Sequence, residues 1–272
     1  MTAAPYAWPD GAPGAFAMTV DVDGPTPHLW KSRNGQPRPA ELEQRGYGPR
    51  RGIWRLLDVF AEAGVTGSFY IPGAYAQQNP HVVREIAARG HEIGLHGWMH
   101  EPPIDLDRAG FLDVTRRALD MLRELAGDGA ATGYRSPSWD MTDAAFEVLL
   151  ELGLAYDSSM MGDDRPYRLA GITEIPVSWV LDDAPFYRYV GGASPGHPPF
   201  RPREVVQRWV DEVDAAARYG TLAVLTVHDW LSGRPAAAVA LAELLAHVRE
   251  RGVWIATGAE LASWHNTQEV PV

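Results

Sequence analysis

The sequence has no cysteine among its 272 residues, which excludes disulfides and thiolate metal sites. Basic residues are also few: 24 lysines and arginines stand against 35 aspartates and glutamates, giving a net charge of −11. This acidic balance argues against a nucleic-acid-binding surface. No apolar run approaches the roughly 18 to 20 residues that a membrane span needs. Any metal site must therefore use histidine, aspartate or glutamate, and we expect neither nucleic acid nor a membrane as a partner.

The N-terminal segment, MTAAPYAWPDGAPGAF, lacks the basic start and continuous apolar core of a signal peptide. A cytoplasmic location is therefore expected. The length of the chain fits one large α/β domain or two small ones.

Short apolar runs rich in β-branched residues alternate with amphipathic segments along the chain. The predicted strands cover 16–22, 65–71, 91–96, 132–135, 155–159, 173–179, 221–228 and 253–257. The predicted helices cover 53–64, 81–90, 107–126, 142–153, 202–219 and 236–251, and long loops are expected at 24–52 and 180–201. This alternation predicts parallel strands joined by helical crossovers, and the number of units favours a complete or irregular barrel over an open sheet.

Ionisable side chains recur at the carboxyl ends of the predicted strands, where barrels of this kind place their chemistry. They are Asp21, Asp23, His96, His100, Arg135, Asp157 and His228. In an extended chain the two aspartates, at i and i+2, face the same side, where two bare carboxylates would repel each other. A divalent cation removes this difficulty by binding one and leaving the other to act as a base.

His96 and His100 are spaced i, i+4, which brings two imidazoles to one face if the segment is helical. Two histidines and one aspartate leave open coordination positions, which is typical of catalytic rather than structural zinc. Each residue also has a simpler interpretation. The His-x-x-x-His spacing could be incidental, Arg135 a surface ion-pair partner, Asp157 a cap and His228 a core histidine. Their joint occurrence at strand ends favours one shared metal site.

Five short motifs in order resemble those of the polysaccharide deacetylase superfamily, carbohydrate esterase family 4. They are TVDVDG, HGWMH, RSPSW, YDSS and LTVH, and the resemblance spans roughly residues 16–262. It implies a distorted (β/α) barrel of about seven parallel strands, with 1–272 forming a single catalytic domain. The ordered set is specific, although no single motif is.

The resemblance also implies residue roles. Asp21 would be the general base, and Asp23 would bind Zn²⁺ or another divalent ion together with His96 and His100. Arg135 would hold and tune Asp21. His228 would be the general acid, and Asp157 would help to orient it.

The sequence departs from the family pattern in informative ways. One residue separates the aspartates, and a glycine replaces the hydroxyl residue of the histidine motif. The spaced aspartates, the PVSWVLDD segment and the expected lack of a signal peptide resemble the branch of cytoplasmic peptidoglycan deacetylase-like proteins, whose relatives include cyclic imide hydrolases and metal-independent allantoinases. All three metal ligands are present here, which favours a metal-dependent member. Relatives in this branch imply a homo-oligomer.

Four tryptophans flank the motifs and are candidate substrate contacts: Trp98, Trp139, Trp179 and Trp230. Their rings could stack on a sugar, enclose a small planar ring or simply fill the core. Because the long loops could roof the site, we expect hydrolysis of a small cytoplasmic amide, such as a cyclic imide or ureide. N-deacetylation of an acetylated sugar or peptidoglycan is the alternative. A non-catalytic binding protein on the same fold is a further one, although such a protein needs neither base nor acid.

Overall fold

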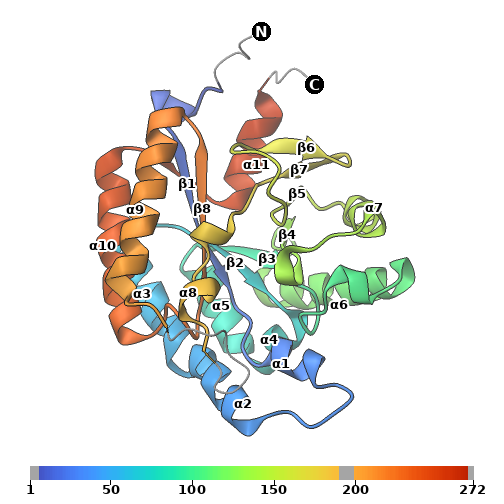
Figure 1. The fold of residues 1–272 in the computed structure, drawn as a ribbon. Helices are drawn as coiled ribbons and strands as arrows, with labels where there is room; N and C mark the ends of the chain where they lie inside the picture. Colours follow the sequence, from blue (N-terminus) through green and yellow to red (C-terminus); the bar gives the residue numbers. More distant parts are fainter. Residues whose placement is uncertain (1–5, 190–198, 269–272) are drawn as a thin grey trace.

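The fully buried strand β1 (Ala15–Asp21) organises a single curled sheet in this computed structural model, which describes residues 6–189 and 199–268. Within those residues the sheet has nine strands in the order β6-β7-β5-β4-β3-β2-β1-β8, and β9 also pairs with β1 (Figure 1). The other strands are β2 (Ser68–Ile71), β3 (Glu92–Leu95), β4 (Gly133–Tyr134), β5 (Tyr156–Asp157), β6 (Tyr167–Leu169), β7 (Ile172–Glu174), β8 (Leu222–His228) and β9 (Trp254–Ile255).

Helices cover the outer face of the sheet in two groups, α3 with α9 and α10, and α4 to α7. The helices are α1 (Thr26–Lys31), α2 (Pro39–Arg45), α3 (Ile53–Ala63), α4 (Gly73–Gln78), α5 (Pro80–Ala88), α6 (Arg108–Ala126), α7 (Asp143–Glu151), α8 (Ala184–Tyr187), α9 (Pro202–Tyr219), α10 (Pro235–Arg251) and α11 (Gly258–Thr267). Shorter helical turns lie at Pro9–Gly11, Gly48–Gly52, Pro103–Asp105, Pro137–Trp139 and Trp179–Leu181. The predicted distorted barrel is confirmed.

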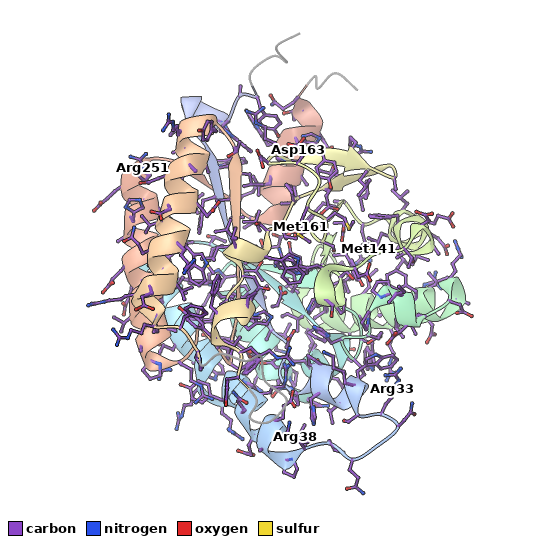
Figure 2. All side chains as sticks on the ribbon, in the orientation of Figure 1. Arg33, Arg38, Met141, Met161, Asp163 and Arg251 are labelled. Carbon is purple, nitrogen blue, oxygen red and sulfur yellow. The ribbon has the colours of Figure 1, made fainter. Side chains whose placement is uncertain are left out.

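The alternation of side chains along β1 separates the core from the site. Phe16, Met18, Val20 and Val22 face the large apolar cluster between sheet and helices, which Figure 2 shows filled with side chains. The intervening small residues Ala15 and Ala17 belong to a second cluster on the concave face. Because strand side chains alternate, Asp21 and Asp23 continue that concave row.

The sheet departs from an all-parallel one at its β6 edge, where β6 and β7 form an antiparallel hairpin. The two residues between them, Ala170 and Gly171, both have positive φ, at 47° and 90°. This is the backbone that a two-residue type I′ hairpin turn requires. The predicted strand 173–179 is therefore mostly wrong: β7 ends at Glu174, and Pro176 lacks the N–H that a ladder needs.

The predicted helix 53–64 is confirmed as α3, which ends where Gly64 adopts the left-handed conformation at φ 63°. The expected loop 24–52 instead contains α1, α2 and a π-helical turn, and α11 was not predicted. Thr257 and Glu260 form a capping box at the start of α11, a signal that the sequence did contain. Of the predicted loop 180–201, residues 190–198 lie outside the described part of the chain.

Candidate active site

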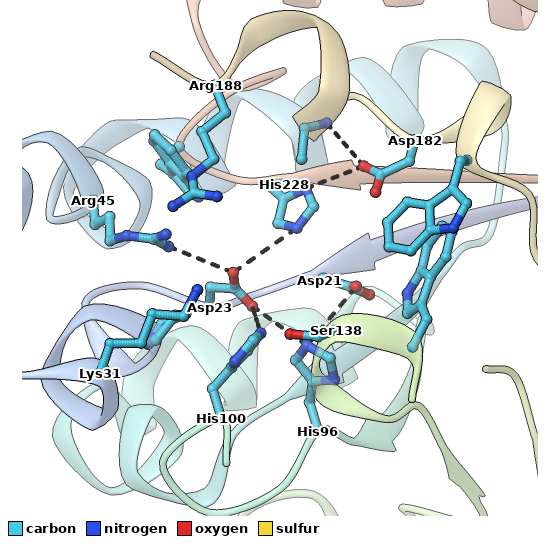
Figure 3. A pocket seen from close by; sticks show the side chains of 15 residues that line it. Asp21, Asp23, Lys31, Arg45, His96, His100, Ser138, Asp182, Arg188 and His228 are labelled. Atoms are coloured by element: carbon cyan, nitrogen blue, oxygen red, sulfur yellow. Dashed lines mark hydrogen bonds and ion pairs between the residues drawn. The ribbon is translucent and has the colours of Figure 1, made fainter. Parts of the chain in front are cut away.

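Strand register brings the acidic and basic candidates to one level of the sheet. Asp21 at the end of β1 pairs directly with His228 at the end of β8 and with Tyr70 on its other side. Tyr134, which precedes Arg135, pairs with Leu95, which precedes His96. The carboxyl ends of these strands therefore open into one cavity of about 180 Å³, which communicates with solvent (Figure 3).

Asp23, His96 and His100 have the geometry of a metal-binding set. Asp23 Oδ1 lies 3.4 Å from His96 Nε2 and 3.5 Å from His100 Nε2. Ligand atoms about 2.1 Å from one tetrahedral zinc ion would lie about 3.4 Å apart, which matches these separations. Within the described residues, Asp23 Oδ1 and His96 Nε2 are also buried without a hydrogen-bond partner. Buried polar atoms without partners are costly, and a divalent ion would satisfy both.

The two histidines do not lie on a helix, so the helical condition attached to their spacing is not met. His96 follows β3 and His100 ends an irregular turn, where its φ is 62°. The buried carboxylate of Glu101 accepts hydrogen bonds from the backbone N–H groups of Trp98 and Met99 and so fixes this turn. His96 Nδ1 is 2.8 Å from the carbonyl oxygen of Arg135, which directs Nε2 towards Asp23.

Two of the three residues in this cluster have the protonation state that a metal binds. Burial raises the pKa of Asp23, but the neighbouring histidines outweigh burial and keep that pKa well below its usual range. Burial lowers the pKa of His100 to about 3, so this imidazole is neutral at ordinary pH. Burial also lowers the pKa of His96, but the carboxylates of Asp21 and Asp23 outweigh it and raise that pKa, so a bound ion would compete with a proton at His96.

Asp21 is held by Arg135, as predicted. Arg135 is fully buried, and its Nη1 donates to Asp21 Oδ1 at 2.9 Å and to Thr19 Oγ1 at 2.7 Å. Its other nitrogens donate to the carbonyl and hydroxyl of Ser158, both at 2.9 Å. Because Arg135 donates to Oδ1, the second oxygen of Asp21, Oδ2, is available to accept a proton. Oδ2 lies 3.8 Å from His96 Nε2.

His228 is oriented by Asp183. Its Nδ1 lies 2.7 Å from Asp183 Oδ1, and its Nε2 faces Asp23 Oδ2 at 3.8 Å. Asp183 Oδ2 also accepts from the N–H groups of His228 and Ser232 and from the Ser232 hydroxyl. These donors satisfy Asp183, so the cluster of Asp182, Asp183 and His228 acts as a hydrogen-bond network and not as a second metal site.

The prediction that Asp157 orients His228 is therefore wrong. Asp157 is fully buried behind Arg135, where its Oδ1 accepts from Ser159 Oγ at 2.8 Å. Burial raises its pKa to about 6, and burial beside Asp157 raises the pKa of Glu174 well above its usual value. Ser159 links Asp157 to the backbone N–H of Ser136, next to Arg135.

Three of the four predicted tryptophans line the pocket: Trp139, Trp179 and Trp230. The rings of Trp139 and Trp179 are stacked, with centroids 4.3 Å apart. Ser138 and Trp139 both have positive φ, at 65° and 55°, a costly backbone that often marks functional sites. Trp98 is not among the lining residues, so its assignment is wrong. Its ring packs beneath Arg117, 3.6 Å from the guanidinium carbon, and against Gly73.

Comparison with known proteins identifies the fold and the family. A family model described as Polysaccharide deacetylase matches residues 46–156. One solved structure is that of a Mycobacterium smegmatis protein assigned as a polysaccharide deacetylase. The two chains are 36% identical and superpose with a TM-score of 0.91, covering 100% of this chain and 96% of the other. The chain belongs to the polysaccharide deacetylase family. Peptidoglycan deacetylase of Helicobacter pylori is 27% identical over 90% of this chain and 94% of its own.

A solved allantoinase shares the polysaccharide deacetylase fold with a TM-score of 0.84 at 22% identity, covering 97% of this chain and 94% of its own. Members of the polysaccharide deacetylase family are hydrolases of C–N bonds other than peptide bonds, and dependence on a divalent metal is typical of them. In the part of the chain that the structure describes, no helix is both long and apolar enough to cross a membrane.

Several residues that line the pocket or contact its lining were not predicted: Lys31, Arg45, Ser138, Asp182, Asp183 and Arg188. The only signal for Asp183 was the LDD triplet in PVSWVLDD, noted as a departure from the family pattern but given no role. Asp182 also borders the cavity, and burial raises its pKa to about 7.

Replacement of Asp183 by asparagine is expected to move the alkaline limb of the pH–rate profile to lower pH. Burial opposes protonation of His228, but the Asp183 carboxylate raises the pKa of His228 well above its usual value, so the imidazole stays protonated at neutral pH. Without that carboxylate the proton is lost at lower pH, by about one to three pH units for a charge this close. The profile of kcat/KM against pH measures the shift.

Asp182→Asn is the matched control, because its carboxylate oxygen lies 3.8 Å from His228 Nδ1 instead of 2.7 Å. A smaller shift is expected from this control. An unchanged alkaline limb in Asp183→Asn would contradict the assignment of Asp183 as the group that keeps His228 protonated.

Proposed function

We propose that this enzyme hydrolyses the amide C–N bond of a small cyclic imide or ureide. The reaction would use a divalent metal ion, zinc by preference, held by Asp23, His96 and His100. The observation that supports a small substrate is the burial of the reacting groups: Asp21, Asp23 and His96 are only 3%, 4% and 1% exposed. Helices α1 and α2 and the segment 179–188 wall the cavity, whereas a polymer needs an open groove.

When bound, the ion would polarise the substrate carbonyl and offset the charge that develops on its oxygen. Asp21, fixed through Oδ1 by Arg135, accepts a proton from the attacking water on Oδ2. As the new C–O bond forms and the C–N bond breaks, protonated His228 gives the Nε2 proton to the leaving nitrogen, because an amide anion leaves very poorly. Asp183 holds His228 Nδ1 and stabilises the imidazolium. The products are a carboxylate and the freed nitrogen group.

The second candidate is N-deacetylation of an acetylated sugar, and the name of the Helicobacter pylori relative favours it. The same base, acid and metal ligands would serve that reaction. A non-catalytic binding role is the third alternative, and turnover of any amide excludes it. The single domain over 1–272, the cytoplasmic location and the homo-oligomer stay predictions from the sequence.

A side-by-side assay distinguishes these candidates. Zinc-loaded protein is incubated separately with succinimide, hydantoin, allantoin and the acetylated sugar tetra-N-acetylchitotetraose. Product formation is followed by liquid chromatography. The proposal predicts turnover of at least one cyclic compound, with kcat/KM at least about tenfold above that of the acetylated sugar, which is the discrimination given by about 1.4 kcal/mol. Deacetylation of the oligosaccharide alone would contradict it, and no turnover of any amide would favour a binding role.

A further inference from the structure

One wall of the pocket is formed by three cationic side chains: Lys31 at the end of α1, Arg45 at the end of α2 and Arg188 just after α8. Figure 3 shows their charged ends turned towards Asp23 from the same side of the cavity. The carboxyl group of Asp182 lies on the opposite side of the cavity in Figure 3, and the stacked rings of Trp139 and Trp179 also line the cavity. The pocket therefore combines a cluster of positive charge with aromatic surface.

Arg45 is already paired within the protein. Its Nη1 lies 3.5 Å from Asp23 Oδ2 and its Nε 3.6 Å from Glu41 Oε1, and its guanidinium carbon lies 4.6 Å from the Trp230 ring centroid. These contacts fix Arg45 as a positioning residue for the metal ligand Asp23. Its charge is largely offset by the two carboxylates.

Lys31 and Arg188 differ from Arg45 because neither makes an ion pair with an acidic group in residues 6–189 and 199–268. Arg188 Nε is buried without a hydrogen-bond partner there. Lys31 is exposed to solvent at its surface, yet partial burial and the neighbouring guanidinium groups of Arg188 and Arg45 lower its pKa, so these cations repel one another. Converging like charges are costly unless a ligand supplies the opposite charge.

We propose that Lys31 and Arg188 bind a carboxylate group of the substrate, so that this enzyme acts on amides that carry an acidic substituent. A planar guanidinium fork beside an ammonium group suits the two oxygens of a carboxylate. The scissile amide then lies at Asp21 and Asp23, the body of the substrate lies against Trp139 and Trp179, and its carboxylate lies against the cationic wall. This inference rests on the proposed hydrolysis for the identity of the scissile bond, but the anion site itself can be tested by binding alone.

The test compares two ligands that differ by one carboxymethyl group, hydantoin and hydantoin-5-acetic acid. Isothermal titration calorimetry on zinc-loaded Asp21→Asn protein gives their dissociation constants without turnover. The acid is expected to bind at least tenfold more tightly than hydantoin, and this preference is expected to fall about tenfold in Lys31→Gln and in Arg188→Gln, each made in the same background. N-acetylmuramic acid and N-acetylglucosamine form a second pair, which tests the same site with a sugar.

Arg33→Gln is the matched control, because it removes the same charge two residues from Lys31 and outside the pocket. Arg33 pairs with Asp105 at 3.7 Å and stacks on Trp30, near the outer edge of the molecule (Figure 2). The preference for the acid is expected to be unchanged in this control. Equal affinity for acid and neutral ligand in both pairs, binding of neither acid, or an equal fall in Arg33→Gln would overturn the anion site.

Turnover separates this proposal from the proposed function. If the wild-type enzyme hydrolyses none of succinimide, hydantoin, allantoin and hydantoin-5-acetic acid while the acid preference depends on Lys31 and Arg188, the cyclic-amide proposal fails and the anion site stands. If it hydrolyses at least one of these cyclic compounds and the acid preference is missing, the cyclic-amide proposal stands and the anion site fails.

Discussion

Replacing Asp21 with asparagine is expected to lower kcat by about a thousandfold, within the range for loss of a general base, while the protein still binds one divalent ion. The substitution keeps the size of the side chain and a group that can accept from Arg135 Nη1, now 2.9 Å from Asp21 Oδ1. It removes the only property that the mechanism requires of this residue, a carboxylate oxygen that can take a proton from water. Measurement of kcat together with elemental analysis of bound metal separates the two effects.

Asp23→Asn is the informative comparison, because Asp23 Oδ1 faces both His96 and His100. That variant is expected to lose activity and metal together, whereas Asp21→Asn loses activity alone. A turnover number within about tenfold of the parent in Asp21→Asn would remove the base assignment, since general bases contribute at least about a hundredfold.

Replacing His228 with alanine is expected to lower amide hydrolysis by about a hundredfold to ten-thousandfold and to affect an activated ester much less. The reason lies in the leaving group. The nitrogen of an amide must receive a proton as it departs, while a nitrophenolate leaves as a stable anion. The kcat/KM values for an amide substrate and for 4-nitrophenyl acetate, measured on the same zinc-loaded preparation, give the two losses.

His247→Ala is a suitable control, since His247 pairs with Asp214 on the surface of the molecule and lies outside the pocket. Both substrates should be hydrolysed at the parent rate by this variant. If His228→Ala loses the same factor on amide and ester, His228 acts on binding or on the structure of the site and not as a general acid.

The parts of the site that the sequence predicted are those that local pattern and strand order determine. Asp21 ends a buried strand and Asp23 lies two residues further on. The alternation of side chains directs Val22 into the apolar core between sheet and helices and both carboxylates into the cavity. Their meeting with His96, Arg135 and His228 follows from the convergence of parallel strands at one edge. A shift of the strand by one residue would turn both aspartates towards the apolar core, so the alternation of apolar residues fixes which face they occupy.

The remaining residues depend on contacts between distant segments that no local pattern encodes. Asp183 reaches His228 because the segment after β7 runs beside β8, where Asp182 forms an isolated bridge with Thr226. The family resemblance assigned Asp157 to His228, but β4 and Arg135 lie between β5 and that histidine. Trp98 was misassigned because proximity in sequence to two metal ligands does not fix the side of the turn on which a ring packs.

The central claim is that Asp23, His96 and His100 hold one divalent ion that hydrolysis of the C–N bond requires. The most direct test is titration of metal-stripped protein with zinc, with bound metal and hydrolysis of an amide substrate followed together. Activity is expected to rise with bound zinc and to level off at one ion per chain, and His96→Ala is expected to bind no ion and to stay inactive. Full activity in protein shown by elemental analysis to be free of metal, or zinc binding unaffected by His96→Ala, would contradict the claim.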